Sequence, residues 1–141
     1  MKVSDILQSK GNNVFSVTEN ISVFDALKIM GEKNIGALVV MDNDKLQGII
    51  SERDYARKII LKGKASQDTQ VKDIMTEKVI SVLPEDSIEK CMELMSGKHI
   101  RHLPVIDNDK VVGIISITDV VTAIIQMQKE TITYLQNYIS Q

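Results

Sequence analysis

The chain of 141 residues contains a single cysteine, two prolines and no tryptophan, and aromatic residues make up only 4% of it. The lone cysteine, Cys91, excludes an internal disulfide and fits a reducing compartment. No apolar run approaches the roughly 18 residues of a membrane span, and the first residues lack the apolar stretch of a signal peptide. We therefore expect a soluble, cytoplasmic protein with no membrane partner.

An excess of charge of one sign is also lacking. The sequence has 17 basic and 19 acidic residues, so its formal net charge is −2. General nucleic-acid binders normally show a clustered basic excess, so nucleic acid is not an expected partner. The hydrophobic fraction of 43% supports a core of aliphatic side chains, and the length is that of one compact module.

What the chain does contain is an internal repeat. The segment Gly-Ile-Ile-Ser-Glu-Arg-Asp at 48–54 returns 65 positions later as Gly-Ile-Ile-Ser-Ile-Thr-Asp at 113–119. Residues 14–55 match 79–120 without a gap, and 18 of these 42 positions are identical. Such a match indicates two copies of one supersecondary unit, and we expect the function to lie where the copies meet.

Each copy has the pattern of a β-α-β-β-α unit preceded by a short helical tag. The first helix of each copy is expected to begin near Ser22 or Asp86, in capping boxes that end at Asp25 and Glu89. The tags are expected at 3–7 and 71–75, the first strands at 14–17 and 79–82, and the hairpin strands at 37–41, 46–51, 102–106 and 111–116. The second helix of the first copy is expected from about Glu52 to Lys62.

The last helix of the second copy carries an apolar stripe well past the repeat. The positions of the stripe are Val120, Val121, Ile124, Ile125, Gln128, Ile132, Leu135 and Ile139. An apolar stripe with nothing left in its own chain to cover usually packs on a partner, although the helix could instead fold back over its own sheet. The expected fold is α/β (α+β), with two small sheets related by a pseudo-twofold axis. Residues 1–65 form the first repeat, 66–127 the second and 128–141 a C-terminal helical extension of one compact module.

The Gly-to-Asp segments carry the candidate chemistry. The glycine permits close approach to the backbone, and the two isoleucines make an apolar wall. The hydroxyls and the free amides of the next helix face the same place, and that end of a helix attracts anions. A carboxylate such as that of Asp119 can accept from both hydroxyls of a ribose. Ser51 to Asp54 and Ser116 to Asp119 also read as plain helix caps, and the repeat does not decide between the two readings.

The arginines favour an anionic ligand. The chain has only three, Arg53, Arg57 and Arg101, and two of them stand in or beside the first Gly-to-Asp segment. Arg101 stands where a strand of the second copy begins. Arginine is the preferred fork for phosphate, so this placement suits a phosphorylated ligand.

With the segment Ile-Arg-His-Leu-Pro-Val at 100–105, these motifs resemble a tandem pair of CBS (cystathionine-β-synthase) domains, also called a Bateman module. The resemblance implies a stand-alone, non-catalytic regulatory module that senses cellular energy. It implies an adenosyl ligand (AMP, ADP or ATP, in some members NAD or S-adenosylmethionine) in clefts between the repeats, and no other cofactor. It also implies a homodimer and a regulated target protein that the sequence does not identify.

The resemblance also assigns residues to two clefts. In the first, Asp119 would hold the ribose, and Arg101 would reach the phosphate. The other residues of this cleft would be Ser116, Thr118, Ile114, Phe15, Ile35, Gly36 and Ala37. The second cleft would contain Asp54, Ser51, Ile49, Ile80, Ile100 and His102. Arg53 stands there in place of a hydroxyl of the family pattern, and it would either grip a phosphate or fill the cleft.

Other sites are set aside on the sequence. The spacing of Asp42, Asn43 and Asp44 fits a turn better than a calcium loop, because Gly48 falls one place late. Cys91 matches the core position Ala26, which argues against a metal site with His99 and His102. No set of residues is placed for nucleophilic catalysis, so an enzyme is not expected. The competing hypothesis is an interaction module whose Ser-x-x-Asp segments only cap helices.

Overall fold

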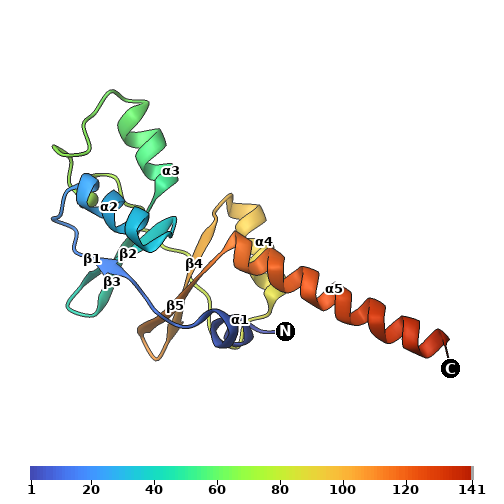
Figure 1. Ribbon diagram of the computed structural model, residues 1–141. Helices are drawn as coiled ribbons and strands as arrows, with labels where there is room; N and C mark the ends of the chain where they lie inside the picture. Colours follow the sequence, from blue (N-terminus) through green and yellow to red (C-terminus); the bar gives the residue numbers. More distant parts are fainter. Residues whose placement is uncertain (141) are drawn as a thin grey trace. The chain divides into compact units, whose positions relative to one another are not determined.

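The computed structural model describes residues 1–140, and the chain forms two compact units. The continuous unit is Asn13–Ile80. The split unit combines Met1–Asn12 with the chain from Ser81 onward. Each unit combines helices with a small sheet built on an antiparallel hairpin, so the predicted α+β class is confirmed (Figure 1).

The continuous unit has a three-stranded sheet of order β1-β2-β3. Its elements are β1 (Ser16–Val17), α2 (Val23–Lys33), β2 (Ala37–Asp42), β3 (Lys45–Ser51), α3 (Glu52–Tyr55), a π-helical turn Ala56–Ile60 and a 3-10 turn Val71–Asp73. Strand β1 runs parallel to β2, and β2 pairs antiparallel with β3. Asn43 and Asp44 take positive φ of 49° and 66°, which is the backbone that a two-residue hairpin requires. Met30 of α2 and Ile59 pack on Leu38, Val40 and Ile50 of the sheet to form an aliphatic core.

The split unit repeats this plan with a two-stranded sheet. Its elements are α1 (Val3–Lys10), α4 (Ile88–Lys98), β4 (His102–Asp107), β5 (Lys110–Ser116) and α5 (Ile117–Ile139). The strand predicted at 79–82 is wrong. Only Val82 pairs there, in a parallel bridge to Val105, because its amide donates to Pro104 and its carbonyl accepts from Ile106.

The hairpins and helices otherwise lie where the sequence predicts them, within a few residues at the ends. The capping box predicted at Asp86 is wrong, because the N-cap of α4 is Ser87, whose hydroxyl accepts from the amide of Lys90. Of the capping box predicted at Ser22, the structure shows the N-cap half, in which the hydroxyl of Ser22 accepts from the amide of Asp25. The helix predicted over 52–62 is α3 and its continuation to Ile60.

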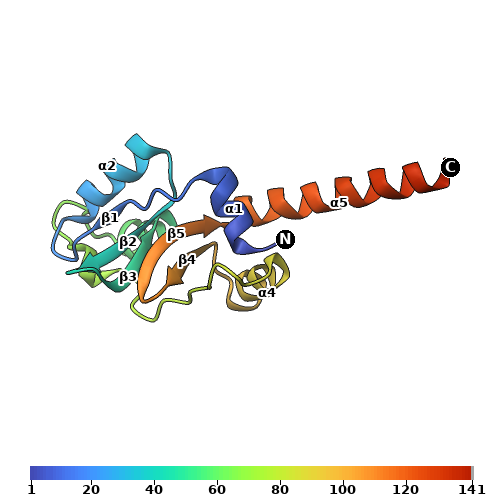
Figure 2. The ribbon, with the colours of Figure 1, turned by 90° about the horizontal axis from the view of Figure 1, so that it is seen from below.

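Each short tag packs against the sheet of the other repeat, not against the sheet of the repeat that it introduces: the first tag packs on the second repeat and the second tag on the first. In the continuous unit, Thr76 exchanges two backbone hydrogen bonds with Ile49 of β3, at 2.9 and 3.0 Å. A Cβ on Gly48 would lie 2.7 Å from the Thr76 carbonyl oxygen. In the split unit, α1 lies beside β5 and the start of α5 (Figure 2), and a Cβ on Gly113 would lie 2.6 Å from the side chain of Leu7. Both glycines therefore make room for a tag.

Helix α5 extends well beyond the sheet that it follows (Figure 1). Only Val120 and Ala123 of this helix are buried, whereas Ile132, Leu135 and Ile139 are 54%, 50% and 81% exposed. The alternative that the tail folds back over its own sheet is therefore wrong. Among residues 1–140, no helix has the length and hydropathy to cross a membrane.

Candidate functional site

Both Gly-to-Asp segments form the junction between a hairpin strand and the helix that follows. Ser116 is the N-cap of α5, and its hydroxyl accepts from the amide of Asp119 at 3.2 Å. The Oδ2 atom of Asp119 accepts in return from the amide of Ser116 at 2.8 Å. Ser51 and Asp54 form the same reciprocal box, at 3.2 and 3.0 Å. The capping reading of these segments is therefore confirmed, and the box fixes where each carboxylate lies.

The carboxylate of Asp119 is also bound by a lysine from the other end of the chain. Lys10, the last residue of α1, places Nζ 2.6 Å from Asp119 Oδ2 and 2.8 Å from the carbonyl oxygen of Ile114. The two side chains are 36% and 22% exposed, so this ion pair stands at the surface. The Oδ1 atom of Asp119 accepts from no residue in the described part of the chain.

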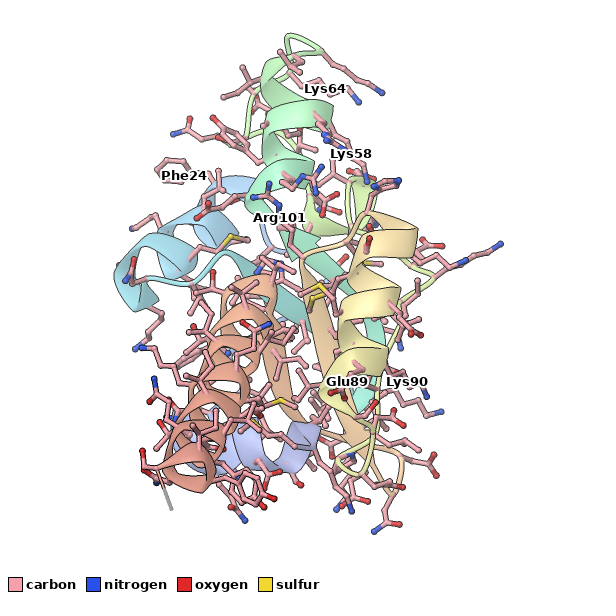
Figure 3. The ribbon with its side chains drawn as sticks, turned by 90° about the vertical axis from the view of Figure 1, so that its right-hand side faces the viewer. Phe24, Lys58, Lys64, Glu89, Lys90 and Arg101 are labelled. Atoms are coloured by element: carbon pink, nitrogen blue, oxygen red, sulfur yellow. The ribbon has the colours of Figure 1, made fainter. Side chains whose placement is uncertain are left out.

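Asp54 is more fully engaged than its counterpart. Its Oδ2 atom accepts from the amide and, at 3.1 Å, from the hydroxyl of Ser51. Its Oδ1 atom lies 3.2 Å from Nζ of Lys58, which also donates to the carbonyl of Ile74 at 2.8 Å. Lys58 stands on the π-helical turn after α3 (Figure 3). Both oxygens of this carboxylate therefore have partners within the continuous unit.

The two junctions also differ at the edge of the sheet. Ile49 has both backbone groups bonded to Thr76, so the edge of β3 is closed by main chain. The equivalent residue of β5, Ile114, lies opposite Pro104, which has no amide hydrogen to donate. The carbonyl of Pro104 accepts from Val82 instead. The backbone groups of Ile114 therefore face the outer edge of β5, where its carbonyl accepts from the Lys10 side chain.

The remaining predicted residues flank these junctions. The carbonyl of Arg101 accepts from the amide of Ile117 at 2.8 Å, and the carbonyl of Gly36 accepts from Glu52 at 3.0 Å. The ring of Phe15 lies 5.2 Å below Nζ of Lys33. In the split unit lie Ile100, Arg101, His102, Ile114, Ser116, Thr118 and Asp119. In the continuous unit lie Phe15, Ile35, Gly36, Ala37, Ile49, Ser51, Arg53, Asp54 and Ile80.

Sequence reasoning missed both lysines that bind the carboxylates. Lys58 follows Asp54 by four residues on a helix, a spacing that favours an ion pair and could have identified it. Lys10 lies 109 positions from Asp119, and no pattern in the sequence connects the two residues.

Other chemistry has little support in the described residues. No group of three or more His, Cys, Asp or Glu side chains is placed to hold a metal ion within residues 1–140. Burial raises the pKa of the Cys91 thiol to about 11, so at neutral pH it is protonated and weakly nucleophilic. The side chain fills the core of the split unit beside Ile88 and Met95 of the same helix face.

Comparison with known proteins places these features in a family. The model of the CBS domain matches the chain twice, at residues 3–61 and 71–126. The mitochondrial CBS domain-containing protein CBSX3 of Arabidopsis thaliana is 43% identical to this chain. The match covers 97% of this chain and 71% of the length of CBSX3.

Two solved structures are also similar. The crystal structure of the CBS domain NE2398 is 46% identical, has a TM-score of 0.85, and is matched over 89% of this chain and 98% of its own. The CBS domain pair of MJ0100, in complex with 5′-methylthioadenosine and S-adenosyl-L-methionine, is 30% identical with a TM-score of 0.77, over 88% and 99% of the two chains. The present chain belongs to the CBS domain family and contains a tandem pair of these domains.

Proposed function

We propose that this CBS pair is a non-catalytic sensor that binds an adenosyl ligand at its Gly-to-Asp segments. AMP, ADP and ATP are the expected ligands, with NAD and S-adenosylmethionine as further candidates. The capping box at the start of α5 carries this proposal, because it holds the Asp119 carboxylate in place and leaves Oδ1 without a partner in the described chain. The relative MJ0100, which binds two adenosyl compounds through its CBS pair, supports the ligand class.

The segment at Asp119 is the stronger of the two candidates. A ribose diol offers two hydroxyl donors, and Asp119 can accept from them without losing its cap. The first turn of α5 adds amides at a helix N-terminus, which favours a phosphate nearby. Both oxygens of Asp54 are already bound by Ser51 and Lys58. We therefore expect the first bound ligand at Asp119, while the roles of Arg53, Ile80 and His102 in a second cleft remain part of the proposal.

Isothermal titration with Asp119→Asn tests the proposal. The asparagine oxygen can still accept from the Ser116 amide, so the helix cap and the fold survive. The charge that strengthens the bonds to a ribose is lost, and we expect affinity for AMP, ATP or S-adenosylmethionine to fall about tenfold or more. Asp54→Asn is the matched control and should reduce this first binding event little. If no adenosyl compound binds the wild-type chain, the proposal is wrong.

A second function has a specific observation in its favour. Both carboxylates serve as helix caps, and both are paired with lysines, which is what a purely structural role requires. An interaction module without a nucleotide ligand would show flat ligand titrations for the wild type and for Asp119→Asn alike. The enzyme hypothesis would need product after prolonged incubation with nucleotide, and the proposed module is expected to form none.

We further propose that the module acts as a cytoplasmic homodimer and reports its ligand to a target protein. The support for the dimer is the exposed apolar stripe of α5, which runs through Ile125, Ile132, Leu135 and Ile139. These residues follow one another at intervals of seven, three and four, the spacing of a helix seam that packs on another helix. A ligand that binds one arrangement of the dimer more tightly than another would shift the balance between them.

A further inference from the structure

Lys10 is bound to two acceptors that an adenosyl ligand would use. Its Nζ atom bonds to Asp119 Oδ2 and to the carbonyl of Ile114 at the same time, at 2.6 and 2.8 Å. The first acceptor belongs to the carboxylate that a ribose diol would use, and a diol that donates to both of its oxygens would need Oδ2 as well as Oδ1. The second is a strand-edge carbonyl, which suits a donor such as the amino group of adenine.

We propose that Lys10 is a displaceable latch on the β5 edge, which competes with the adenosyl ligand and sets its affinity. This inference rests on the function proposed above. Binding of the ligand requires the ammonium group to leave Asp119 and Ile114. The free energy needed to break these two contacts therefore lowers the affinity for the ligand. Lys10 is therefore an internal competitor carried by α1.

Exposure makes the latch easy to open. The Lys10 side chain is 36% exposed, and its ammonium group regains water when it leaves the carboxylate. Ion pairs at such positions contribute little to stability, so a ligand of ordinary affinity can displace the lysine. The contact with Ile114 is also made by a side chain alone, and its loss breaks no backbone pairing.

The continuous unit has no such displaceable lysine at the edge of β3. The edge of β3 is closed by two backbone hydrogen bonds between Ile49 and Thr76, which a ligand cannot displace without moving the tag. Lys58 pairs with Asp54 from the next turn of the same helical segment, and its second acceptor is the tag carbonyl of Ile74. The position of Lys58 corresponds in the second repeat to Ala123, so the lysines at the two carboxylates come from unrelated parts of the chain. This asymmetry restricts the latch to the segment at Asp119.

Isothermal titration of the full chain and its Lys10 variants tests the latch. The probes are 5′-methylthioadenosine, AMP, ATP and S-adenosylmethionine at one ionic strength. Lys10→Met keeps the length of the side chain and removes both donated bonds. We expect it to bind at least one probe about five- to tenfold more tightly than the wild type. Lys10→Arg keeps the charge and the donors and should bind as the wild type does.

Lys58→Met is the matched control, because it removes the same charge from the other carboxylate. Its affinities should stay at the wild-type values. A latch is excluded if Lys10→Met binds every probe equally or more weakly, or if Lys58→Met gains as much. Binding by the wild type with no gain in Lys10→Met would exclude the latch and leave the sensor function standing. Binding of no probe by either protein would exclude both. If Lys10→Met melts early, Lys10→Ala replaces it under the same criteria.

Discussion

Asp86 shows how a single side chain couples the stability of the split unit to pH. Its carboxylate accepts from the amide of Leu83 at 2.8 Å and lies 3.1 Å from Nζ of Lys90 (labelled in Figure 3). The pKa of Asp86 lies below the ordinary value of 3.8, mainly because its carboxylate accepts the hydrogen bond from Leu83. Burial raises the pKa in part, and the nearby Lys90 lowers it further. A carboxyl group with a lower pKa in the folded state stabilises the fold above pH 3.8, and that stability is lost as the pH falls through the folded value.

Asp86→Asn should therefore destabilise the protein at pH 7 and have little effect in acid. The loss of charge weakens the bond from Leu83 and removes the pair with Lys90, which together cost about 1 kcal/mol. Urea unfolding at pH 7 and at pH 2.5 measures both values. Asp109→Asn, in an exposed turn where asparagine also tolerates a positive φ of 64°, is the control. A loss of equal size at both pH values would contradict the assignment.

At the scale of elements, the two tag contacts predict unequal costs for the same substitution. Gly48→Ala would bring its Cβ to 2.7 Å from the carbonyl oxygen of Thr76, a backbone atom tied to Ile49. Gly113→Ala would meet the end of the Leu7 side chain, which can change rotamer. We expect Gly48→Ala to cost about 2–3 kcal/mol and Gly113→Ala about 1 kcal/mol or less, measured by chemical unfolding. Equal costs would show that the two tags pack alike.

The elements themselves could largely be predicted from the sequence. The hairpins follow from alternating β-branched residues around Asn-Asp turns, and α2 follows from its N-cap at Ser22. The strand predicted at 79–82 failed because a strand needs a partner along its length, and only Val82 has one. The placement of the tags could not be predicted either, since the pairing of Thr76 with Ile49 is a tertiary contact without a local pattern.

The candidate site could likewise be predicted only in part from the sequence. The repeat identified both carboxylates and both N-cap serines, and the structure confirms the boxes that they form. Lys10 could not be predicted, because its contact with Asp119 arises only when α1 packs on β5. At the residue scale Cys91 was predicted correctly as a core residue, since it aligns with Ala26 and both are fully buried.

At the scale of the whole molecule, the exposed tail of α5 predicts that the chain pairs with a second copy. Leu135 and Ile139 are 50% and 81% exposed, which is costly for a helix that stays unpaired in water. We expect the wild type to be a dimer, and Leu135→Ser with Ile139→Ser to shift it toward monomer, because both substitutions remove apolar area from the seam. Light scattering after size exclusion over a range of concentrations measures the mass. Asn137→Ser, on another face of the same turn, should leave the dimer intact. A wild-type monomer, or a double variant as dimeric as the wild type, would exclude this seam.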